Sequence, residues 1–263
     1  KTTNYVRDIR ELELAVIDPS DPVTDDVVAI PQSMLSVSNV IRDELLPFDI
    51  KIVKYYKNSK LRAVQPTDTN PATAGTGLRT FALQLKPGTG TDTDSEVDYP
   101  AAYITFFPKG KTKPLGTHLV SLVQAAQEKP EKITVGKNTY DVYLRFKRTY
   151  KPYSMHLIDV RKDDYDGTST PRNYSSKVQL VDVDRDVHRT IDIWMNNPLR
   201  YAGETFYQSG YQFDPVRRIE TTTLQVVTNS GWMIPYVACM LVATGLLAHF
   251  SFTLVRFLRH KSA

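Results

Sequence analysis

The sequence predicts a mainly β (α+β) extracytoplasmic domain with antiparallel sheets and a few short helices, followed by one C-terminal transmembrane helix. Two observations lead to this prediction. Apolar and polar residues alternate with period two along most of residues 1–231, which is typical of half-buried strands. A continuous apolar segment follows at residues 232–258, and it is long enough to cross a hydrocarbon core about 30 Å thick. Residues 259–263 then form a basic tail.

Composition narrows the class of protein further. The chain has 263 residues, of which 41% are hydrophobic and 24% charged, so it can bury a core. Its formal net charge of +4 is small, and Lys and Arg form no long run outside the tail, so no nucleic-acid partner is expected. Cys239 is the single cysteine, which excludes an intrachain disulfide.

Six segments carry the alternation that predicts strands. A hairpin is expected at Gly136–Asn138, because Gly and Asn tolerate positive φ. The apolar positions of the six segments are Leu12, Leu14 and Val16; Phe48, Ile50 and Ile52; Phe81, Leu83 and Leu85; Val142, Leu144 and Phe146; Ile191, Ile193 and Met195; and Leu224 with Val226.

Two other segments have helical spacing. The first is "QSMLSVSNVIRDELL" at 32–46, and the second is "THLVSLVQAAQEK" at 117–129, with Thr117 as the expected N-cap. The tracts at 65–77 and 86–98 are rich in Thr, Pro, Gly and Asp. Such tracts bury too little apolar surface to offset their ordering entropy, so mobile loops are expected there.

The two ends of the apolar segment differ in a way that predicts topology. Trp232 and Tyr236 lie at one boundary, and Arg256, Arg259, His260 and Lys261 lie at the other. Aromatic rings favour the headgroup level and Lys and Arg favour the cytoplasm, so the C-terminus is expected to be cytoplasmic. Residues 1–231 would then be periplasmic, on the bacterial inner membrane. Because the chain starts at Lys1 without a signal peptide, we expect the C-terminal part of a longer protein.

Signatures of enzymes and metal sites are absent from the sequence. It contains no phosphate-binding glycine loop, no paired cysteine cluster, no His-Glu-x-x-His and no Gly-x-Ser-x-Gly, so no catalytic or metal-binding residue is predicted. The acidic run at Asp182–Arg189 is interpreted as a solvated turn. His118, His156 and His188 are scattered rather than spaced as ligands. An enzyme acting alone is therefore disfavoured.

His249 differs from the other histidines because it lies inside the apolar segment, where a polar ring tends to face protein or a cavity. On a helix it shares one side with small residues such as Gly245, which would let another helix approach closely. Two hypotheses follow. In the first, His249 contributes an axial imidazole to haem or polarises a cofactor pocket, and in the second it makes an interhelical hydrogen bond.

The segment "IDIWMNNPLRYAGETFYQSGY" at 191–211 lies shortly before the apolar segment. Its pattern predicts a strand, a turn at Asn196–Pro198, and a second strand after a tight bend at Gly203. In the second strand, alternation places Phe206, Gln208 and Gly210 on one face. It places Tyr207, Ser209 and Tyr211 on the other.

This segment resembles the ResB (Ccs1) family of cytochrome c biogenesis proteins, together with "PRNYSSKVQLVD" at 171–182, "TTLQVV" at 222–227 and "ATGLL" at 243–247. The resemblance extends from about Phe48, where "LPFDIKIVKYY" is similar to a family strand, and the insert from Leu61 to about Lys151 departs from it. The matching motif positions are Asn197, Pro198, Leu199, Gly203, Phe206, Tyr207, Gln208 and Ser209, with Tyr174 and Ser176 upstream.

The resemblance implies a function that composition does not reveal. ResB-like proteins work with a CcsA/ResC-type multi-span partner in the system II complex, which delivers haem and attaches it to apocytochrome c. The chain would then be a non-catalytic, membrane-anchored subunit that handles haem transiently. Phe206, Tyr207 and Gln208 would either shape the surface that faces the partner or haem, or serve the fold alone.

A second class of function stays open. A single-pass, membrane-anchored binding or sensing module would have the same β-rich domain and the same helix. Such a module would need neither haem nor a multi-span partner. A membrane-tethered hydrolase that uses dispersed Asp and His residues is a third, weaker alternative.

Overall fold

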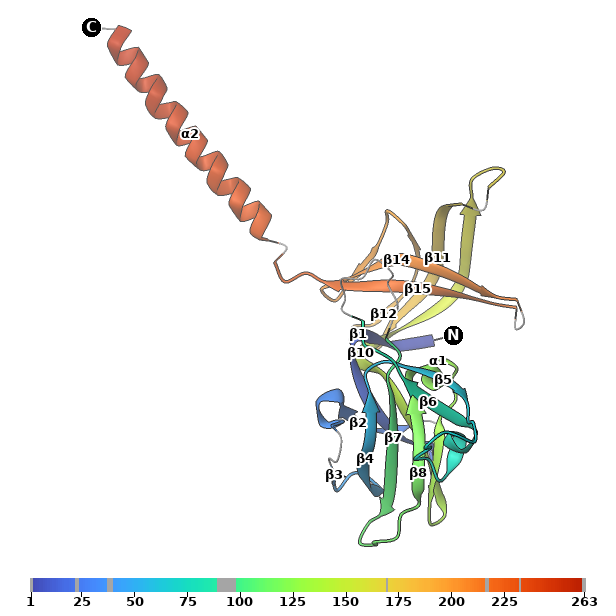
Figure 1. Ribbon diagram of the computed structural model, residues 1–263. Helices are drawn as coiled ribbons and strands as arrows, with labels where there is room; N and C mark the ends of the chain where they lie inside the picture. The colour runs from blue at the N-terminus through green and yellow to red at the C-terminus, as the bar shows by residue number, and fades with distance from the viewer. Residues whose placement is uncertain are drawn as a thin grey trace. The chain divides into compact units, whose positions relative to one another are not determined.

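The computed structural model describes residues 2–21, 24–36, 40–88, 98–168, 170–215, 218–231 and 233–261. Antiparallel strands dominate the described residues, short helices are few, and one long helix lies at the C-terminal end, as Figure 1 shows. The predicted fold class is therefore confirmed. Contacts between Cα atoms divide the chain into two compact units. Unit 1 comprises Lys1–Asn4 and Lys151–Ala263, and unit 2 comprises Tyr5–Tyr150.

Unit 2 is built from three groups of antiparallel strands. One sheet has the order β3-β4-β7-β8, β5 pairs with β6, and β1 lies between β2 and β10, which also pairs with β9. The elements are β1 (Thr2–Asp18), β2 (Asp26–Pro31), η1 (Gln32–Met34), β3 (Val40–Ile41), β4 (Phe48–Tyr56), β5 (Ser59–Ala63), η2 (Gly75–Leu78), β6 (Thr80–Gln84), β7 (Ala101–Pro108), β8 (Gly116–Ser121), α1 (Leu122–Ala126), β9 (Glu131–Val135) and β10 (Asn138–Asp164).

The centre of unit 2 is strand β7, which is covered on both faces. Ile104 and Phe106 pack into the larger cluster with Phe48, while Tyr103 on the opposite face packs with Leu119. Successive side chains of a strand point to opposite faces, so one strand serves two apolar clusters. This burial explains why "AAYITF" reads as a nearly continuous apolar run.

The predicted helix at 32–46 is wrong. Only Gln32–Met34 form a 3-10 turn, Val40 and Ile41 form β3, and residues 37–39 lie outside the described part of the chain. Ile41 pairs with Ile50 of β4 and is buried in the larger cluster. A β-branched pair that completes a sheet therefore outweighs the helical spacing of the local sequence.

The second predicted helix exists but starts later than expected. Residues 116–121 form β8, and α1 begins at Leu122. The N-cap is Ser121, whose Oγ accepts a hydrogen bond from the backbone N–H of Gln124 at 3.2 Å. Thr117 is therefore not the N-cap, because it lies inside β8, opposite Thr105 of β7.

The predicted turn at Gly136–Asn138 is confirmed. Asn138 pairs with Val135 across the turn from β9 to β10, and Gly136 has φ of 64°. The tract at 65–77 is a loop, but specific contacts attach it to the unit. Thr73 N donates to Thr117 O at 2.9 Å, and Thr76 Oγ1 donates to the buried carboxylate of Glu131 at 2.6 Å. Residues 89–97 of the second predicted loop lie outside the described residues.

Unit 1 consists of two packed antiparallel sheets. The second half of β10 continues into β11 (Pro171–Asp182) and β12 (Val187–Trp194), and the other sheet has the order β13-β14-β15. Those strands are β13 (Leu199–Tyr201), β14 (Glu204–Asp214) and β15 (Ile219–Thr228). Side chains of both sheets meet in one apolar cluster that includes Tyr153, Val178, Ile193, Leu199 and Phe206.

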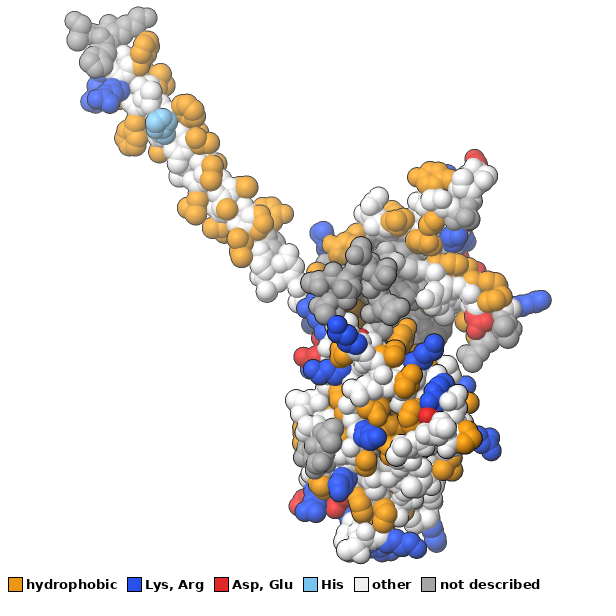
Figure 2. Space-filling view, viewed as in Figure 1, with side chains coloured by type: hydrophobic (Ala, Val, Ile, Leu, Met, Phe, Trp, Pro, Cys, Tyr) orange, Lys and Arg blue, Asp and Glu red, His pale blue; other side chains and the backbone are white. Residues whose placement is uncertain are grey.

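The last element is α2 (Ile234–Lys261). Over Ile234–Arg259 its mean hydropathy reaches 1.8, and none of that apolar stretch is buried against the rest of the chain. Figure 2 shows apolar side chains along the whole visible length of the helix, with Lys and Arg gathered near its C-terminal end. A helix of this length and composition, exposed along its apolar surface, is able to cross a membrane. Trp232, at the predicted boundary, lies outside the described residues.

Candidate functional site

The motif identified in the sequence forms two turns and two strands in unit 1. Trp194 and Asn197 form a bridge, with Asn197 N donating to Trp194 O at 2.9 Å, so the chain turns sharply before Pro198. Ala202 and Gly203 both have positive φ, 50° and 78°, between the paired residues Tyr201 and Glu204. Positive φ at both central residues is the geometry of a two-residue hairpin, so the predicted bend at Gly203 is confirmed.

Phe206 is the apolar centre of the motif. It is 3% exposed and packs with Leu199 and with residues of the facing sheet. The ring of Tyr153 lies edge-to-face against Phe206, with centroids 6.2 Å apart, and edge-to-face against Tyr201 at 5.2 Å. Such geometries are favourable for aromatic quadrupoles and add to the burial of the rings.

Gln208 holds a buried polar network beside that cluster. Its Oε1 lies 2.7 Å from Ser176 Oγ, and its Nε2 donates to Thr222 Oγ1 at 2.9 Å and to Gly210 O at 3.0 Å. Ser176 and Gln208 are 1% and 7% exposed. Every polar atom of this amide has a partner, so the network links β11, β14 and β15 without an unsatisfied group.

The same residues explain an irregularity in β14. Gln208 pairs with Leu224 but Gly210 pairs with Thr223, so Ser209 is an extra residue in a β-bulge. The side chain of Ser209 donates to Thr223 O at 3.0 Å across the bulge. The Gln-Ser pair of the motif therefore supports the bulge from both faces of the strand.

The bulge corrects one prediction about which way the side chains point. Phe206 and Gln208 are buried and Tyr207 is 38% exposed, as the alternation predicts. Tyr211, however, stacks on Tyr174 of β11, with centroids 6.3 Å apart and planes at 18°, so it lies on the inner face. An inserted residue shifts the period-two pattern by one position, and alternation read from the sequence contains no such shift.

Two carboxylates lie at one end of the apolar cluster, where β14 begins and β11 ends. Glu204 accepts hydrogen bonds from Lys151 Nζ at 2.7 Å and from the hydroxyl of Tyr153. Burial opposes the ionisation of Glu204, but these two hydrogen bonds outweigh it and hold its pKa below the ordinary value. Burial, together with the bond to Glu204, raises the pKa of the Tyr153 hydroxyl, so that hydroxyl stays protonated at neutral pH.

Asp182 is the second of these carboxylates, and its position corrects the sequence interpretation. It is 1% exposed and accepts hydrogen bonds from the Tyr201 hydroxyl at 2.6 Å and from Arg185 N at 3.2 Å. The bond to Asp182 raises the pKa of Tyr201. Only the following residues, 183–186, form the exposed turn that the sequence predicts. An Asp at the start of a turn commonly accepts a hydrogen bond from a backbone N–H of that turn, and this preference is the sequence signal that indicates the role of Asp182.

Taken together, these residues form a rigid, fully paired support. Glu204 is ionised, Asp182 accepts two hydrogen bonds, Tyr153 and Tyr201 are protonated, and no thiol lies in the cluster. Within the described residues, no group of three or more His, Cys, Asp or Glu side chains is placed to hold a metal ion. The arrangement positions the strands and turns of the motif.

The contacts of His156 and His118 do not involve this cluster. His156 bonds Thr2 Oγ1 at 2.9 Å, and His118 Nδ1 lies 2.7 Å from Glu131 Oε1 in the core of unit 2. That Glu131–His118 pair also anchors the loop through Thr76, and a Cβ at Gly75 would lie only 1.5 Å from Glu131 Oε1. These contacts are structural.

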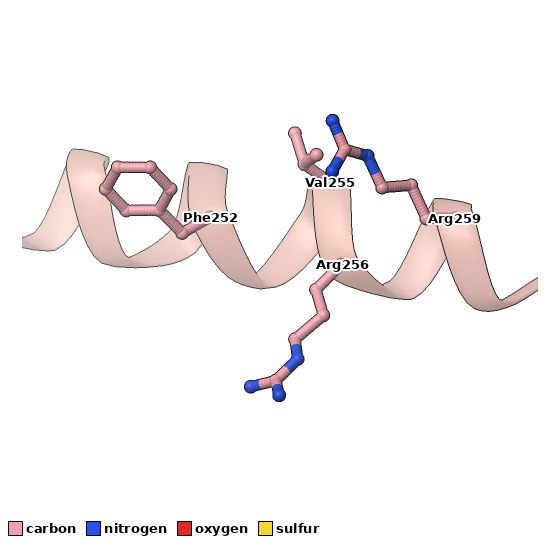
Figure 3. Close-up of a pocket in the computed structure, with 4 residues that line it drawn as sticks. All are labelled: Phe252, Val255, Arg256 and Arg259. Carbon is pink, nitrogen blue, oxygen red and sulfur yellow. The ribbon is translucent and has the colours of Figure 1, made fainter.

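The described residues form a groove in unit 2 and a shallow concavity on α2. In unit 2, a groove of about 620 Å³ is lined by residues that include Leu12, Glu13, Leu35 and Tyr55. On α2, a concavity of about 470 Å³ is lined by Phe252, Val255, Arg256 and Arg259. Figure 3 shows that these four side chains project from successive turns of one helix, so this space is helix surface rather than an enclosed site.

His249 lies in the middle part of α2 and is exposed. Thr244 and Thr253 bond backbone carbonyls of their own helix, Met240 O at 2.8 Å and His249 O at 2.9 Å. The His249 ring has an edge contact with Phe250 at 5.7 Å. Nothing in the described residues tests whether it binds haem, so that role stays a prediction.

The fold and motif define a class, a β-rich protein with an apolar C-terminal helix, and the comparisons show what it is similar to. Residues 122–219 match the model of the ResB-like family. Protein NrfI of Wolinella succinogenes is 33% identical over 96 residues, which are 36% of this chain. The chain spans only about 10% of the length of that curated relative.

The matched segment contains every motif position from Tyr174 to Ser209, so the resemblance inferred from the motif is confirmed. It begins well after Phe48, and "LPFDIKIVKYY" lies outside it. The segment also includes Lys151, Tyr153, Asp182, Tyr201 and Glu204, which were not singled out from the sequence. Their roles depend on strand pairing, which a single sequence does not reveal.

Proposed function

We propose that this chain is a membrane-anchored, non-catalytic subunit of a system II cytochrome c maturation complex. The match of residues 122–219 to the ResB-like family is the observation that carries this proposal. In it, α2 crosses the bacterial inner membrane with its basic end in the cytoplasm, and the two β units lie in the periplasm. Haem is a substrate that passes through the complex, and a CcsA/ResC-type partner and apocytochrome c are the other components.

The geometry of the motif favours a structural role for its residues over a role in the chemical reaction. Phe206 and Gln208 are buried and make all their contacts within unit 1, so the purely structural alternative suits them. Of Phe206, Tyr207 and Gln208, Tyr207 is the exposed one, on the outer face of β14, and is therefore available to a partner. In this proposal, thioether formation takes place on the partner.

The proposal is tested by reconstituting maturation in a bacterial host that lacks its own system. The protein that carries this chain is expressed with a reporter apocytochrome c, with and without a CcsA/ResC-type partner, and covalent haem is measured by haem staining after denaturing electrophoresis. Product is expected only when both proteins are present. Covalent product from this protein alone would contradict the non-catalytic role. Equal product from the partner alone would contradict the function.

His249 gives a second expected result. If it is an axial ligand, His249→Ala should shift or abolish the Soret band of the complex purified with its partner, because imidazole ligation sets that spectrum. Thr253→Val is the matched control, since the Thr253 hydroxyl bonds the backbone of its own helix one turn away. An unchanged Soret band in His249→Ala would eliminate the ligand role and leave the interhelical hydrogen bond.

A further inference from the structure

The register of the strands in unit 1 defines which end of the unit is attached to α2. Thr228, the last residue of β15, pairs with Glu204, the first residue of β14. Glu204 in turn pairs with Tyr201 across the turn at Ala202–Gly203. The turn between β13 and β14 therefore lies at the same end of the sheet from which the chain leaves for α2.

A turn of the facing sheet lies at this end as well. The hydroxyl of Tyr201 donates to Asp182 at 2.6 Å, and Asp182 is the last residue of β11 before the exposed turn Val183–Asp186. The guanidinium groups of Arg185 and Arg189 lie over the Tyr201 ring, 5.8 Å and 5.7 Å from its centroid. We call this set of two turns and the Thr228 strand end the tethered end.

The connection from the tethered end to α2 is short. Residues 229–233 separate Thr228 from Ile234, so six Cα–Cα steps of about 3.5 Å give at most about 21 Å when fully extended. Part of this connection is turned, because Gly231 N donates to Asn229 Oδ1 and Ile234 N donates to Gly231 O, both at 3.0 Å. If α2 crosses a membrane, the tethered end is held near its surface.

The exposed side chains of the tethered end suit a lipid headgroup layer. Val183 is 84% exposed, the highest value among the exposed large apolar residues of the described chain. Arg185 Nη1 lies 3.7 Å from Asp182 Oδ2, but the Arg185 side chain is 56% exposed, so its guanidinium is also able to form charge-assisted hydrogen bonds to phosphate. Asp184 and Asp186 lie on either side of Arg185 in the sequence. The turn therefore carries both positive and negative charges, as zwitterionic headgroups do.

We propose that the tethered end of unit 1 rests on the lipid headgroups around the start of α2, with Val183 entering the interface and Arg185 and Arg189 meeting phosphates. The contact holds the β13–β14 turn of the motif at the membrane surface. It requires that α2 crosses the membrane and depends neither on haem nor on the side of the membrane. Its failure is therefore distinguishable from failure of the maturation proposal.

The test uses the full chain in lipid nanodiscs of phosphatidylethanolamine and phosphatidylglycerol. Cys239→Ala leaves a chain without cysteine, into which Val183→Cys is introduced and labelled with an environment-sensitive fluorophore. Phe213→Cys is the matched control. It is 52% exposed and lies at the opposite end of β14, nine residues or about 30 Å along the strand from Glu204.

Lipids with a spin label near the headgroup should quench the Val183 label about twofold or more strongly than the Phe213 label. Equal quenching of both labels would overturn the proposal. It would also be overturned if the Val183 label were shielded from aqueous iodide but not quenched by the spin-labelled lipid, because a protein would then cover this end.

Discussion

Phe206→Ala should destabilise unit 1 by about 3–5 kcal/mol, the range measured for removal of a buried aromatic ring. Phe206 is 3% exposed and lies between both sheets of the unit, against Leu199 and the ring of Tyr153. Its removal leaves a cavity that two hydrogen-bonded sheets cannot readily close. The free energy of unfolding is measured by denaturant titration in the variant Trp232→Phe, followed by the fluorescence of Trp194, which then is the single tryptophan of the chain.

Tyr207→Ala is the matched control for this prediction. Tyr207 is the next residue of the same strand and the same motif, but its side chain is 38% exposed on the outer face. A substitution there removes few buried contacts, so stability should change little. Equal losses in the two variants would contradict the assignment of Phe206 to the core. A variant that is stable but inactive in cytochrome maturation would assign Tyr207 to a partner surface.

Every segment predicted as a strand from period-two alternation overlaps a strand of the structure, whereas β3 and β8 lie in segments predicted as helices. Leu14 and Val16, Ile50 and Ile52, and Val142 with Leu144 are all buried in strands. Where both faces of a segment are partly buried, the pattern also fits a helix, and the segment at 32–46 shows this. Its apolar residues serve a tertiary pairing with β4, and no local signal reveals a pairing partner.

The sequence did not indicate the division into two units. Its first 231 residues are uniformly β-rich, and the boundary at Tyr150–Lys151 lies inside the continuous strand β10. A boundary within a strand has no Gly, Pro or polar linker to mark it, which is the signal on which sequence-based domain boundaries depend. Strand β1 likewise contributes residues to both units.

The sequence was sufficient to predict which residues form the candidate site, but not how they are arranged. The family motif indicated Phe206 through Ser209, and all lie in one strand of unit 1. The partners that give these residues their roles, Thr222, Ser176 and Glu204, depend on register, and the bulge at Ser209 is invisible in a two-residue period. The burial of Asp182 was not predicted, because acidic runs are usually solvated. In the structure, the buried carboxylate accepts a hydrogen bond from the hydroxyl of Tyr201.

Glu13→Ala should destabilise unit 2 by about 3–5 kcal/mol, the range for removal of one partner of a buried ion pair. Glu13 of β1 accepts a hydrogen bond from Arg145 Nε at 2.9 Å, and both side chains are 7% exposed. Arg145 Nη2 is already buried without a hydrogen-bond partner in the described structure. Without the carboxylate, a guanidinium that cannot lose its proton remains in the interior uncompensated.

The chain offers an internal control two residues away on the same strands. Glu11 and Lys147 form an equivalent pair at 2.6 Å, but their side chains are 57% and 50% exposed. Glu11→Ala should therefore leave stability almost unchanged, because solvent screens the remaining lysine. Both tryptophans lie outside residues 5–150, so unit 2 must be followed by another signal. Hydrogen exchange of peptides from that range, read by mass spectrometry, serves this purpose.

A double substitution separates the two explanations for such a loss. If the cost of Glu13→Ala comes from the uncompensated charge, the pair Glu13→Met and Arg145→Met should recover much of the lost stability, because apolar side chains of similar volume often replace a buried pair without cost. If the cost comes instead from lost packing, the double variant should be no more stable than Glu13→Ala. Protection against exchange in β1 and the first half of β10 distinguishes these outcomes, since these strands carry the pair.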